Sequence, residues 1–222
     1  MLSITEENYL KAIYRLTIEN NNEVSTGTNE IAVYLGVKPA TATDMLKKLK
    51  EKDYISYEKY GKSSLNQVGK SIAIEIIRKH RLWETFLHQV MEFSWDEVHE
   101  VAEQLEHIKS KKLIDSLDKF LNYPKYDPHG DVIPSADGEI AFRHTKTLNN
   151  ELINHTCEIV GVKDNSSDFL KYIESLDLVL GKIININEIY SFDKSMNISI
   201  NGINKNISEK LAENIVVSCK NC

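Results

Sequence analysis

The sequence predicts a mainly α-helical protein with small β parts, arranged as a winged helix-turn-helix, a helical domain and a C-terminal small β-barrel. Three observations predict this arrangement. Three short helical patterns followed by a β-prone hairpin occupy residues 1–70. Long amphipathic runs fill residues 71–146, and β-branched runs punctuated by Asn and Gly fill most of residues 147–222. We therefore expect three domains with these boundaries.

In the first segment, an apolar and aromatic pattern from Tyr9 to Leu16 marks an amphipathic helix, with Thr5 as its expected N-cap. The run NEIAVYLGV predicts a second helix, after which Gly36 suits the left-handed conformation that ends helices. The run KPATATDMLKKLKEKDYI predicts a third helix with Pro39 at its start. Two β-prone runs around Gly61 then predict the wing hairpin.

The third helix of this segment has the composition of a recognition helix. A generic three-helix core with a hairpin is the alternative, but Lys, Pro and small residues at a helix start favour contact with double-stranded DNA in the major groove. The net charge is −6, whereas residues 1–64 carry equal numbers of basic and acidic residues, so a DNA-binding face must be local and N-terminal. We expect base contacts at the helix start and phosphate contacts farther along and on the wing, from Lys38, Pro39, Ala40, Thr41, Thr43, Lys47, Lys48, Lys59 and Lys62.

The second segment contains three predicted helices. SIAIEIIRKHRLWETFLHQVMEF is the first, and a capping-box pattern from Ser94 opens the second, SWDEVHEVAEQLEHI. The third, KKLIDSLDKFL, ends before Pro124. Helices this apolar exceed the needs of one small domain and therefore indicate a homodimer.

Imidazoles and carboxylates are concentrated on the first two of these helices. In HEVAEQLEH, two imidazoles and two carboxylates share one helical face at i, i+4, i+7 and i+8: His99, Glu103, Glu106 and His107. On the preceding helix His80 and Glu84 are again four residues apart. A solvated acidic face with scattered histidines is the alternative, but two such faces on adjacent helices favour a divalent metal ion. His88 has the same spacing and is interpreted as a packing or surface residue.

In the third segment, SSDFLKYIESL predicts a helix and LVLGKIININEIY, NISING and KNISEKLAENIVVSC predict strands. The three cysteines, Cys157, Cys219 and Cys222, are too few for a disulfide framework, so we expect reduced thiols. The terminal CKNC has no second ligand pair nearby, which favours a solvated tail over a zinc site.

Several functional classes are excluded by what the sequence lacks. No apolar run is long enough to span a bilayer, and the first residues have no basic region before an apolar run, so we expect a cytoplasmic protein without a membrane partner. There is no H-E-x-x-H, no nucleophile elbow and no phosphate-binding Gly loop, so we expect neither an enzyme nor a small-molecule substrate.

The motifs ENYLKAIYRL, RKHRLWETFL, VHEVAEQLEH and DPHGDVIP, in this order, resemble the diphtheria-toxin-repressor and manganese-transport-regulator family over nearly the whole chain. The C-terminal barrel resembles the FeoA type. The resemblance implies a homodimer that binds a palindromic DNA operator when metal-loaded and represses genes for metal uptake. It also implies that Asn8 on the first helix joins the ligands of the helical domain, which are His80, Glu84, His99, Glu103, Glu106 and His107.

The resemblance further implies a second metal site at DPHG. Asp127 and His129 match positions that some members combine with Glu84 and an acid from the barrel, here aligned with Asp168. The alternative is an ordinary turn rich in Pro and Gly.

Two departures from the family pattern concern the choice of metal. Glu103 stands where iron-type members have a cysteine, and Asn8 stands where manganese-type members commonly have Asp. Oxygen and imidazole donors without a thiolate suit Mn²⁺ or Fe²⁺, although Zn²⁺ or Co²⁺ can bind in vitro. Two alternative functions stay open: a metal-independent winged-helix regulator whose His/Glu cluster is structural, and a metalloenzyme with a regulatory N-terminal module.

Overall fold

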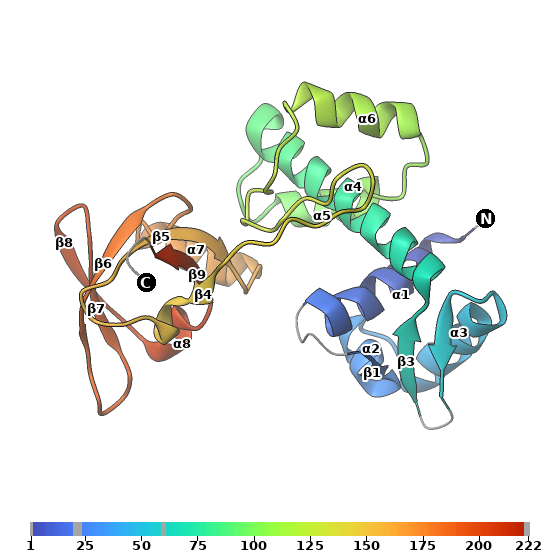
Figure 1. Cartoon of the computed structure of the whole chain (residues 1–222), viewed down its shortest axis with the longest axis horizontal. Helices are drawn as coiled ribbons and strands as arrows, with labels where there is room; N and C mark the ends of the chain where they lie inside the picture. Colours follow the sequence, from blue (N-terminus) through green and yellow to red (C-terminus); the bar gives the residue numbers. More distant parts are fainter. Residues whose placement is uncertain (1, 20–23, 59–60, 220–222) are drawn as a thin grey trace. The chain divides into compact units, whose positions relative to one another are not determined.

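The computed structural model describes residues 2–19, 24–58 and 61–219 (Figure 1). The chain forms two compact units, each assembled from separate stretches of sequence. Unit 1 comprises Met1–Trp83, Glu103–Phe120 and Ile133–Ile140. Unit 2 comprises Glu84–Ala102, Leu121–Val132 and Ala141–Cys222.

Unit 1 begins with helix α1, Ile4–Tyr14, followed by a π-helical turn, Arg15–Glu19. The predicted N-cap, Thr5, is wrong, because Ser3 caps the helix. The Ser3 hydroxyl accepts a hydrogen bond from the Glu6 backbone N–H, and a Glu6 carboxylate oxygen accepts one from the Ser3 N–H. This reciprocal pair satisfies two of the N–H groups that a helix start leaves unpaired, which Thr5, inside the first turn, cannot do.

The predicted winged helix-turn-helix is confirmed. Strand β1 (Thr26–Gly27) leads into α2 (Thr28–Tyr34), and α3 (Pro39–Glu51) starts at its proline as expected. Gly36, between the two helices, has a φ of +64°. Strands β2 (Ile55–Tyr57) and β3 (Lys62–Leu65) form the wing in a sheet of order β1-β3-β2 (Figure 1).

Three further helices follow: α4 (Gln67–Met91), α5 (Val98–Leu105) and α6 (Lys111–Phe120). Helix α5 begins four residues later than the capping-box pattern predicts. Glu97 does reach back to the Ser94 N–H, at 2.9 Å, but this bond closes a turn before the helix rather than its first turn. None of the helices in the described ranges has both the length and the apolar character that a bilayer span requires.

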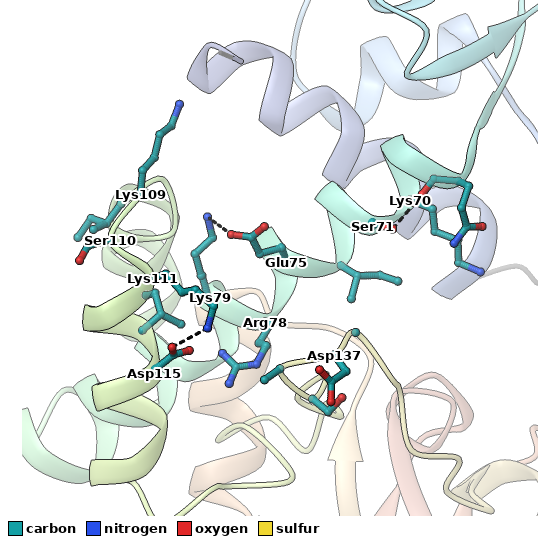
Figure 2. Close-up of a pocket in the computed structure, with 17 residues that line it drawn as sticks. Lys70, Ser71, Glu75, Arg78, Lys79, Lys109, Ser110, Lys111, Asp115 and Asp137 are labelled. Atoms are coloured by element: carbon teal, nitrogen blue, oxygen red, sulfur yellow. Dashed lines mark hydrogen bonds and ion pairs between the residues drawn. The ribbon is translucent and has the colours of Figure 1, made fainter.

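Unit 1 also contains a cavity of about 530 Å³ lined by the first half of α4, the start of α6 and residues 135–138 (Figure 2). Two of its basic side chains are paired with acids of the same lining: Lys79 Nζ lies 3.6 Å from Glu75 Oε1, and Lys111 Nζ lies 2.6 Å from Asp115 Oδ2. No imidazole or thiol is among the lining residues. The candidate metal ligands therefore lie elsewhere in the molecule.

Unit 2 contains a six-stranded antiparallel sheet of order β4-β9-β5-β6-β7-β8, consistent with the predicted FeoA-like domain. Its strands are β4 (Lys146–Thr147), β5 (Thr156–Val162), β6 (Ile183–Ile189), β7 (Met196–Ile200), β8 (Ile203–Ile207) and β9 (Ile215–Cys219). A 3₁₀ turn (Leu148–Asn150) and helices α7 (Ser167–Ser175) and α8 (Glu209–Ala212) complete it. Alternating apolar residues of these strands form its buried core.

Four elements of this unit, β4, the 3₁₀ turn, β5 and α8, are absent from the sequence prediction, and the first two have only two and three residues. Strand β5 is buried over Ile159–Val162 and therefore lacks the alternation that marks a half-buried strand. Helix α8 has four residues and is too short for a helical periodicity to be recognised.

The expectation of reduced thiols at all three cysteines is wrong for two of them. Cys157 and Cys219 form a disulfide. Strands β5 and β9 pair antiparallel and place these two residues directly opposite one another, with Cα atoms 4.1 Å apart. Sixty-two residues of sequence separate them, so only the strand pairing brings the sulfurs together. Cys222 lies outside the described residues.

Candidate metal centres

Helix α1 buries charged side chains on the faces that pack against its neighbours. Glu6, Glu7 and Lys11 are each no more than 6% exposed. Glu6 Oε1 accepts a 2.6 Å hydrogen bond from Lys52 Nζ, just beyond the end of α3. This contact and the capping bonds from Ser3 hold the pKa of Glu6 below its usual value. One face of α1 is thus tied to the end of α3, the predicted recognition helix.

On its other side, α1 places Lys11 among ligand candidates of α4 and α5. The Lys11 ammonium donates 2.6 Å hydrogen bonds to Glu103 Oε1 and to Glu106 Oε2. Its Nζ lies 3.3 Å from His80 Nδ1, and that nitrogen lies 2.6 Å from Glu106 Oε2. A buried ammonium therefore supplies the positive charge that two clustered carboxylates require.

The last residue of the predicted α5 face, His107, also contacts α1. Its Nδ1 lies 2.7 Å from Glu7 Oε2, and its Nε2 lies 3.7 Å from Glu106 Oε1. The Glu7 carboxylate in turn lies 3.4 Å from Lys109 Nζ. Sequence reasoning missed both Glu7 and Lys11. The signal that could have found them is the run EENYLK, which places three charged residues on a helix that must pack in a core.

Two buried oxygens of this group have no hydrogen-bond partner among the described residues. They are Asn8 Oδ1 on α1 and Glu106 Oε1 on the segment that follows α5. Glu106 is 0% exposed, so its second oxygen has no access to water. Leaving such groups unsatisfied costs about 1–3 kcal/mol each. Glu106 Oε1 lies 3.7 Å from the His107 imidazole, and oxygens of this kind are hard donors for a divalent cation, so the residues present fit the metal that the sequence pattern implies.

Unit 2 holds a second group, which consists of Glu84 on α4 with Asp127 and His129 of the DPHG turn. Each of the three residues offers one ligand atom, and these atoms all lie within 4.8 Å of one another. All three residues are buried. His99, which the sequence places on the α5 face, contacts one member of this group: its Nδ1 lies 3.2 Å from Glu84 Oε1. The Glu84 carboxylate thus lies beside two imidazoles, those of His99 and His129.

His129 is held in the orientation of a metal-binding imidazole. Its Nε2 lies 3.1 Å from the Trp95 carbonyl oxygen, and its ring stacks on Trp95 with centroids 5.9 Å apart. Its buried Nδ1 has no hydrogen-bond partner in the described part of the chain, and Glu84 Oε1 lies 3.8 Å away. Metal-binding histidines typically donate their other N–H to a carbonyl or carboxylate in this way.

The charges around His129 dominate its protonation. Burial acts to lower the pKa of the imidazole, but the neighbouring Glu84 carboxylate, followed by Asp127 and the Trp95 carbonyl, raises it to about 9. The pocket therefore favours a cation beside Glu84 and Asp127.

The turn that carries Asp127 and His129 is fixed by backbone hydrogen bonds. Asp127 Oδ1 accepts bonds from the backbone N–H groups of His129 at 2.8 Å and Asp131 at 3.0 Å. Gly130 has a φ of +89°, and a Cβ there would overlap the Val160 carbonyl oxygen of β5. Only glycine fits this position, because the DPHG turn packs closely against strand β5 of the sheet.

Asp168, the weaker candidate for this group, is not part of it. Among the described residues the group consists of Glu84, Asp127 and His129, whereas Asp168 is exposed in the first turn of α7. His88 is exposed, with Nδ1 3.0 Å from the Phe93 carbonyl oxygen, as its surface interpretation expects.

The predicted DNA contacts lie at the start and along the outer side of α3 and on β3. Lys38 is the N-cap, Pro39 the first helical residue, and Thr43 Oγ1 donates a 2.9 Å hydrogen bond to the Pro39 carbonyl. Exposed side chains that could reach a duplex are those of Lys38, Pro39, Ala40, Thr41, Lys47, Lys48 and Lys62, with Thr43 half-buried. Lys59 lies outside the described residues.

Three family models match consecutive parts of the chain. Residues 1–62 match the N-terminal DNA-binding domain of iron-dependent repressors, and residues 66–135 match their metal-binding and dimerisation domain. Residues 146–219 match the FeoA domain.

Among curated proteins, the chain is 33% identical over 120 residues to an uncharacterized HTH-type transcriptional regulator of Methanocaldococcus jannaschii, covering 54% of this chain and 94% of that protein. It is 33% identical over 121 residues to the HTH-type transcriptional regulator MntR of Oceanobacillus iheyensis, covering 54% and 80%. It is also 32% identical over 138 residues to a probable metal transport system membrane protein of Chlamydia trachomatis, covering 60% of this chain but only 30% of that longer protein.

Solved structures resemble the chain over nearly its whole length. A manganese-dependent transcriptional repressor in complex with manganese has a TM-score of 0.86 at 29% identity, covering 96% of this chain and 99% of that one. The manganese regulator SloR has a TM-score of 0.77 at 32% identity, covering 97% and 98%.

Proposed function

This chain belongs to the family of iron-dependent and manganese-dependent transcriptional repressors, and from this we propose that it represses metal-uptake genes when a divalent metal is plentiful. We propose that it acts as a cytoplasmic homodimer on a palindromic operator and catalyses no reaction. The DNA-contacting residues are those on α3 and on the wing named above. The site residues named below are part of this proposal.

The observation that carries the proposal is the position of α1 between two functional elements. Glu6 of α1 binds Lys52 beside the recognition helix, while Glu7 and Lys11 of the same helix contact the α5 segment. Because one rigid helix makes both sets of contacts, any change that fixes α1 against α5 also fixes α3. Metal-dependent DNA binding requires such a link between two sites.

The proposed ligands of the first site are Asn8, Glu103, Glu106 and His107, with His80 beside them. A bound divalent ion would supply positive charge that satisfies Asn8 Oδ1 and Glu106 Oε1 together. Asn8 lies on α1, whereas Glu106 and His107 follow α5, so both sides contribute donors. The chain's own residues then hold α1 in one place: Glu7 orients His107, and Lys11 holds Glu103 and Glu106.

The donor chemistry favours Mn²⁺ or Fe²⁺ as the activating ion. Every candidate donor in the two groups is an oxygen or an imidazole nitrogen, which suits hard and borderline divalent ions. Zn²⁺ and Co²⁺ bind such donors as well, so in vitro binding alone does not identify the cellular signal. For the second site we propose Glu84, Asp127 and His129, with His99 beside Glu84.

The alternative function is a metal-independent winged-helix regulator, in which ion pairs such as that of Lys11 hold the cluster permanently. A metalloenzyme is a weaker alternative, which turnover of a substrate would reveal. One measurement distinguishes the metal-dependent regulator from the metal-independent one. Protein stripped with a chelator is assayed by fluorescence anisotropy on a duplex selected from a random-sequence pool, with and without Mn²⁺, Fe²⁺ (anaerobic), Zn²⁺ or Co²⁺.

We expect Mn²⁺ or Fe²⁺ to raise DNA affinity by at least about tenfold, within the usual range of allosteric coupling. Glu106→Gln should lose this response and keep the weak metal-free binding. The matched control, Glu100→Gln, changes an exposed carboxylate on the preceding helix α5 and should respond as the wild type does. Equal affinity with and without every ion would support the metal-independent alternative.

A further inference from the structure

We propose a third metal site in the sheet domain, formed by Glu151, His155 and Cys219, which binds a thiophilic divalent ion such as Zn²⁺ when the Cys157–Cys219 disulfide is reduced. One ligand atom of each of the three residues lies within 4.8 Å of one from each of the others. All three belong to unit 2, as does Cys157. This site shares no residue with the two groups described above.

The sheet brings the three residues together from distant parts of the sequence. Glu151 follows the 3₁₀ turn after β4, His155 immediately precedes β5, and Cys219 ends β9. Strand β9 pairs with both β4 and β5. These three residues therefore meet at one end of the central strands. The backbone around the site is fixed by this pairing.

The carboxylate of the site is buried. Glu151 is 4% exposed, its Oε2 lies 2.9 Å from His155 Nδ1, and its Oε1 lies 3.8 Å from Lys146 Nζ. Burying a carboxylate is unfavourable without positive charge or hydrogen bonds close by. His155 and Lys146 meet part of this requirement and hold the carboxylate in place, and a bound cation would add positive charge beside it.

The donor set differs from that of the other groups because it contains sulfur. Carboxylate, imidazole and thiolate are ligands of Zn²⁺, with bonds of roughly 2.0–2.3 Å. Ligand atoms around a tetrahedral ion of that size lie roughly 3.5 Å apart, so small side-chain rotations from the observed spacing suffice. Three protein ligands leave one position for water or another donor.

The disulfide controls whether the sulfur is available. A thiolate is a strong metal ligand, whereas a sulfur bonded to another sulfur is not. Cys157 is 1% exposed and Cys219 is half-buried, so Cys219 is the sulfur that an ion or a reductant can reach. A phosphine reductant breaks the S–S bond and becomes its oxide with oxygen from water, and both cysteines gain protons. In the reverse direction, a small disulfide takes up two electrons and leaves as two thiols.

The test uses Co²⁺ as a spectroscopic probe in the full-length chain. A Cys222→Ser background removes the only other thiol of the sequence. The protein is stripped with a chelator, reduced with a phosphine and kept anaerobic. We expect about one Co²⁺ per chain to give a sulfur-to-cobalt charge-transfer band, which Zn²⁺ displaces. The two other groups contain no sulfur, so Co²⁺ bound there gives no such band.

Single substitutions separate the metal site from the disulfide. Cys219→Ser should abolish the band, and His155→Ala should weaken Co²⁺ binding by about tenfold or more. Cys157→Ser keeps the proposed ligands and cannot form the disulfide, so it should show the band without phosphine treatment. The parent should show it only after reduction.

A band that persists in Cys219→Ser, or that is absent from the reduced parent, overturns the proposal. A charge-transfer band in the oxidised parent would show that the disulfide does not determine whether the metal binds. If a serine variant fails to fold, judged by its circular dichroism, Cys219→Ala and Cys157→Ala replace the pair with the same expected results.

Discussion

At the scale of single residues, Lys11 determines how the proposed metal site behaves without metal. Its side chain is 5% exposed and is shared by Glu103 and Glu106. The ammonium stabilises two clustered carboxylates, and it also competes with any divalent ion for them. We therefore expect metal affinity and the stability of the metal-free protein to respond to this residue in opposite directions.

Lys11→Met should lower the free energy of unfolding of the chelated protein by about 3–5 kcal/mol, because it leaves the buried Glu106 carboxylate without its ammonium partner. Added Mn²⁺ should restore more stability in the variant than in the wild type. Urea unfolding with chelator and with Mn²⁺ measures both effects. The control is Lys111→Met, whose side chain is 85% exposed and which should change stability by less than about 0.5 kcal/mol. Equal losses in the two variants would contradict the role given to Lys11.

His129 is the residue that best reports on the proposed second site. His129→Ala should lower the number of Mn²⁺ ions bound per chain by one and leave the Asn8, Glu106 and His107 group occupied. Equilibrium dialysis with metal analysis measures the stoichiometry. His144→Ala, an exposed imidazole of the same unit, is the matched control and should bind as the wild type does. Unchanged stoichiometry in His129→Ala would return DPHG to the role of an ordinary turn.

At the scale of elements, the backbone conformation of the DPHG turn positions Asp127 and His129 for the proposed second site. Gly130→Ala should be destabilising by about 3 kcal/mol or more, since it adds a clash with the Val160 carbonyl to the strain of a positive φ. Gly181→Ala, where φ is +81° and nothing lies within 4 Å, carries only the strain and should cost about 1 kcal/mol. Thermal unfolding measures both variants. Similar losses of stability in Gly130→Ala and Gly181→Ala would mean that a Cβ at residue 130 is tolerated next to β5.

The recognition helix α3 is the element expected to carry DNA affinity. Lys48→Ala should weaken binding to all DNA sequences and reduce the slope of log affinity against log salt by about one unit, because one phosphate contact is lost. Anisotropy titrations at several salt concentrations measure the slope. Lys112→Ala removes an exposed lysine from α6 and should leave the salt slope unchanged. An unchanged slope for Lys48→Ala would remove this residue from the proposed phosphate contacts.

At the scale of the whole molecule, acid stability depends on how α7 is attached within unit 2. Asp96 Oδ2 accepts a 2.7 Å hydrogen bond from Ser167 Oγ and lies 3.0 Å from Lys171 Nζ. Ser167, then Lys171, lower the pKa of Asp96 from 3.8 to about 2. Because the pKa is lower in the folded state, the stabilisation is fully present above pH 4 and is lost as the pH falls from about 4 to about 2.

Asp96→Asn should therefore lower stability at neutral pH and flatten its fall between about pH 4 and about pH 2. Denaturant unfolding at a series of pH values measures this dependence. Glu174→Gln changes an exposed carboxylate of α7 and should keep the slope of the wild type. A wild-type slope in Asp96→Asn would show that other carboxylates control acid unfolding.

Local patterns in the sequence determined the winged helix, the helical segments, the β character of the C-terminal segment and the residue types of a metal protein, and the resemblance added the FeoA type. Periodicity, Pro39 and Gly36 are properties of neighbouring residues, so they can be read without the fold. His80, Glu103 and Glu106 could be proposed as ligands because helical spacing and family resemblance both point to them. The fold class followed because each segment buries one periodic face.

Only the tertiary structure decided which of these residues meet. It placed the Lys11 ammonium between Glu103 and Glu106, and it grouped His99 with Glu84. It also left Asp168 outside the second group and joined Cys157 to Cys219 across two strands. The physical reason is the same in each case: helical or strand period fixes the face a residue occupies, whereas its partner depends on how distant segments pack against that face.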